Sequence, residues 1–543
     1  MKKHLYIIPL ICFCIALGFC AGENLNEGIE RREIETTKVV LVPGANKLDE
    51  VLTYIDECYV DEIDMDSVIE SSIPKVLSSL DPHSLYIPID EVEATNSELE
   101  GSFSGIGIRF SIQEDTINIS EVIRGGPAEK VGMLDGDKII LINDSLFVGK
   151  DVCTNNVAMK KLKGPKGSFV KLGIMRYGEK ELLDFNIRRD NIVVESIEAA
   201  YTINNKWGYL MIDKFAENTY TEFIYKALLM KGNMRDNIEG LILDLRGNGG
   251  GYMGVAINIA NEFLEKRDMI VYTEGDNSRK AYELADGNGS LKDIPVVILV
   301  DETSASASEI LAGTIQDNDR GTIIGRRTFG KGLVQQSIEL SDGSFMRLTI
   351  ARYHTPSGRC IQKPYVKGDK EQYEMDLLER YTRGEFFSQD SIHQNEELVY
   401  KTKKGRIVYG GGGIMPDIFV SSDTANITQY VQEAISRGLV AQFSLKFSTV
   451  NRPKLSKLEG YQSLVSHLNN LPIVEEFMEF AKAKGLEQNN IISNEAYKVL
   501  KRSLYSNIIY QLQGMLEHIK YINLEDPTVL KAIEVLEKGE SFP

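Results

Sequence analysis

Apolar and polar positions divide the chain into stretches of different character. Apolar residues recur at helical spacing over residues 47–80, and Pro82 interrupts this pattern. Residues 100–192 contain short β-branched runs separated by Gly, Asp and Asn turns, which is typical of a small β-rich domain. Strands and helices alternate over residues 196–362, and residues 425–540 return to helical spacing almost throughout. The pattern therefore predicts helical N- and C-terminal regions around a β-rich domain and an α/β core.

The β-rich domain is expected to hold two short helices besides its strands. One helix begins at Gly126-Pro127, where proline suits the first helical turn, and the other ends before Gly164-Pro165. Its strands are predicted at residues 106–112, 116–122, 138–142 and 169–176.

Two uninterrupted apolar runs mark the predicted core, at residues 241–245 and 296–300. Such runs are typical of parallel strands that are buried on both faces, and each is followed by a Gly- or Ser-rich turn into a helix. A polar, charge-rich insertion follows at residues 363–408, before a short strand near residues 414–420.

The N-terminus has the pattern of a targeting segment. Lys2 and Lys3 precede a 15-residue apolar run at residues 5–19, which as a helix would rise only about 22 Å. This length favours a signal peptide over a spanning helix, so we expect export to the bacterial periplasm or cell envelope. Cys20 ends a segment that resembles a lipoprotein signal, although Phe19 departs from that pattern, and two interpretations stand: lipidation of Cys20, or a plain end of the apolar run.

Charge and cysteine content exclude several classes of protein. The 79 acidic and 61 basic residues give a formal net charge of −18, which argues against a nucleic-acid partner. The six cysteines show no C-x-x-C spacing. No metal and no cofactor are therefore expected.

A serine-rich turn carries the first candidate chemistry. The buried run at residues 296–300 leads into Ser-Ala-Ser-Ala-Ser-Glu at residues 304–309, where a helix begins near Ser306. A nucleophile at that position lies at a helix N-terminus, whose N–H groups favour a developing oxyanion. The small neighbours Ala305 and Ala307 leave room for a substrate backbone.

A candidate base lies downstream. Lys331 stands between two glycines in Thr-Phe-Gly-Lys-Gly, and burial would lower its pKa so that a neutral amine could accept the serine proton. If residues 333–340 form a strand, Gln335 falls on the same face as Lys331 and could hold the amine without adding charge. The Gly-rich turn at residues 247–251 could supply a second oxyanion donor, although such a turn alone could equally bind phosphate.

These residues together resemble the carboxy-terminal processing peptidases, or tail-specific proteases, which are serine proteases with a Ser–Lys dyad. The resemblance implies that Ser306 is the nucleophile, Lys331 the base and Gln335 its orienting partner, with an oxyanion hole made by the backbone amides of Gly250 and Ala307. Some members of the family implicate an acid at the position of Asp317. As the partner of the dyad, Asp317 is less favoured than Gln335. The departures are Gly249, where the family often has proline, and the 363–408 insertion. The matching segments lie at residues 79–84, 105–108, 126–130, 135–137, 244–248, 304–309, 328–332, 353–359 and 413–418.

The resemblance also implies that residues 100–192 form a PDZ domain. An extended peptide would then add a strand beside residues 106–112, and N–H groups near Gly105, Ile106, Gly107 and Ile108 would capture its terminal carboxylate. The expected partners are proteins or peptides with free, apolar C-termini. Ile106, Ile108, Val157 and Leu162 are expected to select the tail, and the alternative for the last two is a place in the domain core.

The expected architecture is multidomain α/β and α+β, with a PDZ domain inserted before an α/β, crotonase-like protease core. The expected function is an exported serine endopeptidase that acts through an acyl-enzyme, and a homo-oligomeric assembly is left open. The competing interpretation is a catalytically inactive scaffold or ligand-binding relative, against which the intact catalytic residues argue. The predicted divisions are a signal peptide at 1–20, a tether at 21–45, a helical segment at 46–99, the PDZ domain at 100–192, the core with its insertion at 193–422 and a helical region at 423–543.

Overall fold

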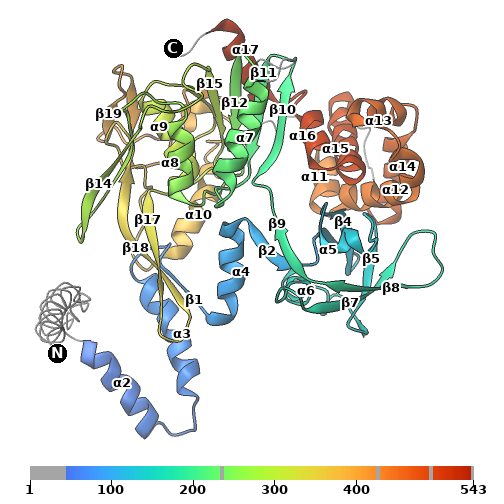
Figure 1. Ribbon diagram of the computed structural model, residues 1–543, viewed down its shortest axis with the longest axis horizontal. Coiled ribbons are helices and arrows are strands. Elements are labelled where there is room, and N and C mark those ends of the chain that lie inside the picture. Colours follow the sequence, from blue (N-terminus) through green and yellow to red (C-terminus); the bar gives the residue numbers. More distant parts are fainter. Residues whose placement is uncertain (1–44, 233–237, 423–427, 488–492, 540–543) are drawn as a thin grey trace, which may run out of the picture. The chain divides into compact units, whose positions relative to one another are not determined.

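The computed structural model describes residues 45–232, 238–422, 428–487 and 493–539 (Figure 1). The predicted signal segment, Cys20 and nearly all of the predicted tether lie outside the described residues. The chain divides into two compact units between Ser72 and Ile73. The first unit contains α2 (Ala45–Cys58) and the beginning of α3 (Met65–Ser78), where the apolar spacing predicts helices.

A six-stranded sheet forms the centre of the second unit. Its first two strands are antiparallel and its remaining pairs are parallel. The two apolar runs predicted as buried strands are neighbours in this sheet and are buried at every position. The strands are, in order across the sheet, β10 (Ile197–Ile203), β11 (Trp207–Ile212), β12 (Gly240–Asp244), β15 (Val296–Val300), β16 (Thr322–Gly325) and β21 (Ile418–Phe419).

Helices cover both faces of the core sheet. One face packs against α7 (Thr219–Gly232), α8 (Met253–Asn261) and α9 (Ala307–Asp317), which Figure 1 shows in green on one side of the strands. The opposite face packs against α16 (Met515–Ile522) and α17 (Pro527–Lys538). Sequence-based division places α17 in the C-terminal helical region, but its apolar side completes the core of the α/β sheet.

An antiparallel sheet and the 363–408 segment lie beside the core sheet. In the antiparallel sheet β18 (Phe345–His354) pairs with β1 (Leu85–Ile87), β13 (Met269–Gly275) and β17 (Leu333–Glu339), and β13 also pairs with β14 (Ser278–Leu284). The 363–408 segment contributes α10 (Lys370–Thr382), the 3-10 helix η1 (Gln389–Ser391), β19 (Val399–Lys401) and most of β20 (Ile407–Tyr409).

The β-rich domain has the predicted strands and helices, each within two or three residues of its expected bounds. Pro127 stands at the start of the first short helix, and the Thr154 side chain caps the second. A two-stranded ribbon of β2 and β9 and the helix α4 adjoin the domain. The elements are α4 (Ile89–Glu100), β2 (Ser102–Gly105), β3 (Ile108–Gln113), β4 (Thr116–Val122), α5 (Pro127–Lys130), β5 (Lys138–Ile142), β6 (Ser145–Leu146), α6 (Asn155–Leu162), β7 (Phe169–Met175), β8 (Leu183–Arg188) and β9 (Asp190–Val193).

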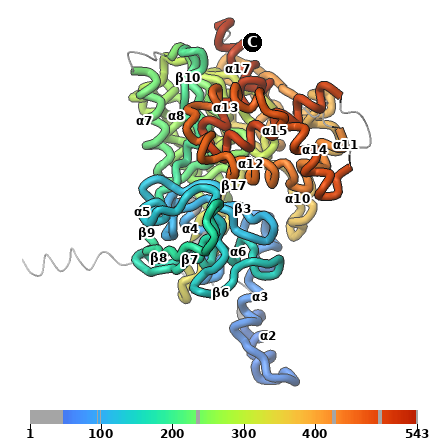
Figure 2. Tube along the Cα trace, turned by 90° about the vertical axis from the view of Figure 1, so that its right-hand side faces the viewer, coloured from blue at the N-terminus to red at the C-terminus, as the bar shows by residue number. Residues whose placement is uncertain are grey.

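The remaining C-terminal helices share a hydrophobic core of their own, and Figure 2 shows them gathered in one orange and red group. Phe443, Phe477 and Phe480 form its aromatic centre. Within the described residues, the structure has no helix long and apolar enough to cross a membrane. The helices are α11 (Gln429–Ser436), α12 (Leu439–Leu455), α13 (Gly460–Leu468), α14 (Ile473–Ala483) and α15 (Asn494–Gln513).

Packing of α17 on the core sheet predicts a specific loss of stability. Val529 is fully buried in the cluster that also contains Trp207, whereas the adjacent Leu530 is 48% exposed. We expect Val529→Ala to lower the free energy of unfolding by about 2 kcal/mol, because it leaves a cavity under the sheet. Leu530→Ala should change it by less than about 0.5 kcal/mol. Urea unfolding followed by the fluorescence of Trp207, the only tryptophan of the chain, measures both, and equal effects would contradict the packing.

Candidate active site

Ser306 lies at the turn that joins β15 to α9. The turn is fixed because the Ser304 hydroxyl donates to the Leu245 carbonyl at 2.8 Å and the Asp301 carboxylate accepts the Ser304 N–H at 3.1 Å. Ser306 itself has φ 57° and ψ −113°, a sparsely populated conformation for a residue with a side chain. Its N–H donates to Glu309 Oε2 at 2.9 Å, which helps to hold this strained turn. A strained serine between a buried strand and a helix is the geometry of a nucleophile turn.

The Gly-rich turn after β12 lies directly against Ser306. The Asn248 carbonyl accepts both the Ala305 N–H at 3.0 Å and the Ser308 hydroxyl at 2.9 Å. A Cβ atom on Gly250 would lie 2.8 Å from the Ser306 Cβ and 3.1 Å from the Ala307 nitrogen. Only glycine therefore permits this approach, and the structure places Ser306 beside the two residues predicted to form the oxyanion hole, Gly250 and Ala307.

The Gly250 amide has a partner in the Gly-rich turn. The Gly250 N–H donates to Asn248 Oδ1 at 2.8 Å. Asparagine side chains commonly accept a hydrogen bond from the backbone N–H two residues later and so stabilise a turn. The Gly250 amide, predicted to form part of the oxyanion hole, is therefore hydrogen-bonded within its own turn. The Ala307 N–H belongs to the first turn of α9, where helical amides have no carbonyl partner within the helix.

One buried carboxyl group joins the serine turn to the lysine loop. Glu309 Oε2 accepts the N–H groups of Ser306 at 2.9 Å and Lys331 at 2.8 Å. Glu309 Oε1 accepts the Thr328 hydroxyl at 2.5 Å and the Gly330 N–H at 2.7 Å. Burial raises the pKa of Glu309 to about 7, and the four donors act in the opposite direction. Sequence reasoning placed Glu309 in the motif but gave it no role, because its partners become neighbours only in the fold.

A buried tyrosine makes a second link between the same two backbones. The Tyr353 hydroxyl contacts the carbonyl oxygens of Ser306, at 3.1 Å, and Lys331. Burial raises the pKa of Tyr353 well above its ordinary value, so the hydroxyl keeps its proton and acts as a donor. The nucleophile and the candidate base are thus fixed to one another through both their amides and their carbonyls.

Lys331 and Gln335 lie together as the sequence predicts. Lys331 Nζ donates to Gln335 Oε1 at 3.2 Å. Burial lowers the pKa of Lys331, and the positive charge of Arg347 lowers it further, while Glu309 and Asp81 act in the opposite direction. A lowered pKa increases the fraction of neutral amine at neutral pH, which is the form that can accept a proton.

Residues 81–84 hold the other side of Gln335, a role that sequence reasoning missed. Gln335 Nε2 donates to the His83 carbonyl at 2.5 Å. Asp81 fixes this turn, since its carboxylate accepts the Ser84 hydroxyl at 2.6 Å and the Thr349 hydroxyl at 3.0 Å. Thr349 is the cross-strand partner of Gln335. The family motif at residues 79–84 indicated that this turn has a role. The sequence alone did not show that its partner is Gln335, because Gln335 lies 252 residues after His83.

Asp317 does not reach the lysine loop as an acid. Its carboxylate is buried and accepts Arg359 at 2.7 Å and the Ser357 N–H at 3.1 Å. The Arg359 guanidinium is equally buried. Because breaking a buried ion pair leaves an unpaired charge, this pair has a structural role.

The predicted tail-binding residues of the β-rich domain take different places. Ile106, Ile108 and Leu162 are buried in the core of that domain, whereas Val157 is 38% exposed. The burial of Leu162 favours its place in the domain core, and selection of a tail by Ile106 and Ile108 stays a prediction. The strand β3 lies at one edge of the domain sheet, next to Gly105 and Gly107 in the sequence.

Across the described part of the chain, no group of three or more His, Cys, Asp or Glu side chains is arranged to hold a metal ion. The site consists of protein groups that can attack, exchange a proton and donate hydrogen bonds.

Comparison with known proteins identifies the family. The model of peptidase family S41 matches residues 206–372, which contain the Gly-rich turn, Ser306 and Lys331, and a PDZ-domain model matches residues 96–175. The carboxy-terminal processing protease CtpB of Bacillus subtilis is 33% identical over 363 residues, which are 64% of this chain and 74% of the relative. The chain belongs to peptidase family S41. It is a serine-type, C-terminal processing endopeptidase with a PDZ domain.

The chain is also similar to other known proteins. The carboxy-terminal-processing protease of Bartonella bacilliformis is 37% identical over 306 residues, which are 56% of this chain and 69% of the relative. The solved structure of a photosystem II D1 C-terminal processing protease aligns with 58% of this chain and 89% of that chain, at 27% identity and a TM-score of 0.33. Residues 430–514 match a family of unknown function.

The pKa of Lys331 is predicted to depend on Arg347. Arg347→Gln removes a positive charge that disfavours the ammonium, so the pKa of Lys331 should rise and less amine should be neutral at a given pH. Competitive acetylation of Lys331 with acetic anhydride across pH, read by mass spectrometry, measures this pKa without relying on turnover. Arg352→Gln, on the same strand, is the matched control and should leave it unchanged. A Lys331 pKa that moves down in Arg347→Gln would contradict the prediction.

Proposed function

We propose that this protease cleaves peptide bonds with Ser306 as nucleophile and Lys331 as general base. The neutral Lys331 amine takes the proton of Ser306 Oγ as the oxygen attacks the substrate carbonyl carbon. The resulting ammonium then protonates the leaving amine, and an acyl-enzyme on Ser306 remains. Water, deprotonated by Lys331, hydrolyses that ester and restores the serine.

The observation that carries this proposal is the buried Glu309 carboxyl, which binds the N–H groups of Ser306 and Lys331 through one oxygen atom. Gln335 orients the Lys331 amine and adds no charge that would stabilise the ammonium. The Ala307 N–H supports the oxyanion from the first turn of α9, and Gly250 adds a donor when its bond to Asn248 is shared with the substrate oxygen.

We further propose that the PDZ domain captures the C-terminus of the substrate. The free edge of β3 suits the addition of an extended peptide, and the segment Gly105–Ile108 leads into that edge. The backbone N–H groups of this segment would bind the terminal carboxylate. The substrates are therefore unstructured proteins or peptides with free, apolar C-termini.

Cleavage of an unstructured polypeptide with an apolar tail tests the mechanism. Ser306→Ala and Lys331→Ala should each lower kcat/KM at least about a thousandfold, because each removes a reacting group. Ser337→Ala, an exposed serine on β17, is the control and should retain full activity. The same polypeptide with an amidated tail should show a raised KM if the PDZ domain binds the carboxylate.

Three outcomes would contradict parts of this proposal. Undiminished proteolysis by Ser306→Ala would remove the nucleophile assignment, and retained turnover by Lys331→Ala would require another base. Tight binding without cleavage by the wild-type protein would favour the inactive scaffold.

Export is proposed from the first twenty residues, whose basic start and apolar run are typical of a signal peptide. Mass spectrometry of the mature protein from a bacterial host is expected to show an N-terminus that begins at a lipid-modified Cys20. A mature chain that begins elsewhere, or that carries no lipid, would restrict the proposal to simple export. Cys20→Ser is the matched variant, and it should lose both the lipid and this cleavage site.

A further inference from the structure

The 363–408 segment contacts the loop that carries Lys331, although it departs from the family pattern. Its helix α10 begins after Asp369, whose side chain caps the helix by accepting the Gln372 N–H at 2.9 Å. Three side chains of the segment reach the catalytic region: Lys363, Tyr373 and Arg380.

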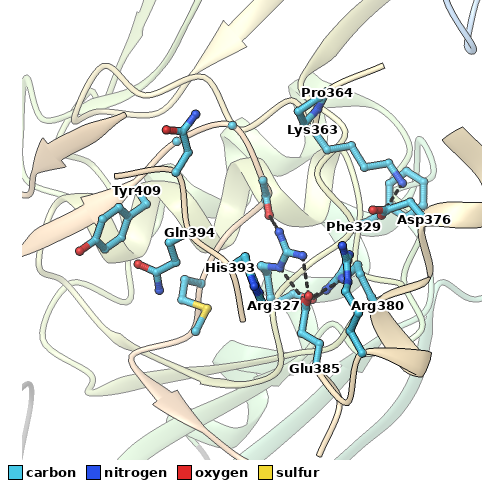
Figure 3. Close-up of a pocket in the computed structure, with 17 residues that line it drawn as sticks. Arg327, Phe329, Lys363, Pro364, Asp376, Arg380, Glu385, His393, Gln394 and Tyr409 are labelled. Carbon is cyan, nitrogen blue, oxygen red and sulfur yellow. Dashed lines mark hydrogen bonds and ion pairs between the residues drawn. The ribbon is translucent and has the colours of Figure 1, made fainter. Parts of the chain in front are cut away.

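Arg380 holds the backbone three and four residues before the lysine. Its buried guanidinium donates to the carbonyl oxygens of Arg327 at 2.7 Å and Thr328 at 3.0 Å, and to Glu385 at 2.8 Å. Glu385 in turn binds Arg327 through both of its oxygens, as Figure 3 shows. These buried charges satisfy one another around a cavity of about 320 Å³, which indicates a structural network rather than a ligand site.

Lys363 and Tyr373 enclose the ring of Phe329, two residues before the lysine. Lys363 Nζ lies 4.0 Å from the centroid of the Phe329 ring and 4.1 Å from that of Tyr373. The Lys363 N–H also donates to the Gly330 carbonyl at 2.9 Å. The segment thus restrains the loop through the Phe329 ring and the Gly330 carbonyl.

Tyr373 makes the contact of greatest consequence. Its hydroxyl lies 2.9 Å from His83 Nε2 and accepts a hydrogen bond from Gln362 Nε2 at 3.4 Å, so it links the His83 ring to the segment. Burial, together with the charge of Lys331, lowers the pKa of His83 to about 4, which keeps the imidazole neutral. The backbone carbonyl of His83 is the group that holds Gln335.

We propose that Tyr373 is a positioning residue for catalysis, which acts through His83 and Gln335 to orient the Lys331 amine. This inference rests on the Ser–Lys mechanism proposed above. It gives the 363–408 segment a role in catalysis. The segment holds the turn at His83, and the His83 carbonyl holds the Gln335 side chain that binds the Lys331 amine. Loss of the Tyr373 hydroxyl would leave peptide binding intact and would misplace the base.

Tyr373→Phe tests the proposal, because it removes one hydroxyl and keeps the ring. We expect kcat to fall about tenfold while KM stays within about twofold, as expected when an interaction that aligns the base is lost. The rate at which diisopropyl fluorophosphate modifies Ser306 should fall by the same factor, since that reaction needs the base but no peptide binding. Tyr365→Phe is the matched control: its ring packs on Tyr373, and no hydrogen bond of its hydroxyl is found among the described residues. It should behave as wild type.

A double-variant cycle separates positioning from general destabilisation. If Tyr373 acts through Gln335, then Tyr373→Phe should have no further effect on kcat in a Gln335→Ala background. His83→Ala should reproduce the loss and provides an independent measurement if Tyr373→Phe folds poorly. Losses that multiply in the double variant, or wild-type kcat in both Tyr373→Phe and His83→Ala, would overturn the proposal.

Activity measurements distinguish the Ser–Lys dyad from the role of Tyr373. Full activity of Ser306→Ala or Lys331→Ala would overturn the dyad and this inference with it. Inactive Ser306→Ala and Lys331→Ala together with an unaffected Tyr373→Phe would overturn the role of Tyr373 alone.

Discussion

The catalytic geometry depends on one buried carboxyl group, that of Glu309, which accepts four hydrogen bonds from two loops. Removing a carboxylate from water is costly, and the raised pKa of Glu309 reflects that cost. The cost is offset because each donor would otherwise be a buried polar group without a partner. The strained backbone of Ser306 and the position of the Lys331 loop are consequently parts of one network, and a change at either loop affects the other.

The surroundings of Lys331 hold the residue in place without neutralising a positive charge on its amine. Its neighbours hold it by an amide and by backbone bonds, and no carboxylate forms an ion pair with its amine in the described structure. Burial and Arg347 together keep the pKa of Lys331 down. Two distant parts of the chain, residues 81–84 and the 363–408 segment, support this amine together with the adjacent strand β17. Such convergence is what a base requires when it must be both uncharged and precisely placed.

The C-terminal helices contribute to two different hydrophobic cores. Helices α11 to α15 bury apolar side chains among themselves, whereas α16 and α17 cover a face of the central sheet. The face they cover contains Tyr209, whose hydroxyl donates to Asp244 at the end of β12, directly before the Gly-rich turn. Arg246 joins Asp244 to Asp526, the capping residue of α17. The last helix is therefore linked to the turn that faces Ser306.

Local pattern determined the strands of the β-rich domain, the two buried core strands, the serine turn and the pairing of Lys331 with Gln335. Those features depend on neighbours a few residues apart, such as Gln335, which lies four residues after Lys331 near the start of β17. Only the tertiary structure decided the roles of Glu309, His83 and Tyr373, the engagement of the Gly250 amide by Asn248, and the burial of Ile106. Each of these depends on which groups meet after the chain folds, and periodicity carries no information about contacts between distant segments.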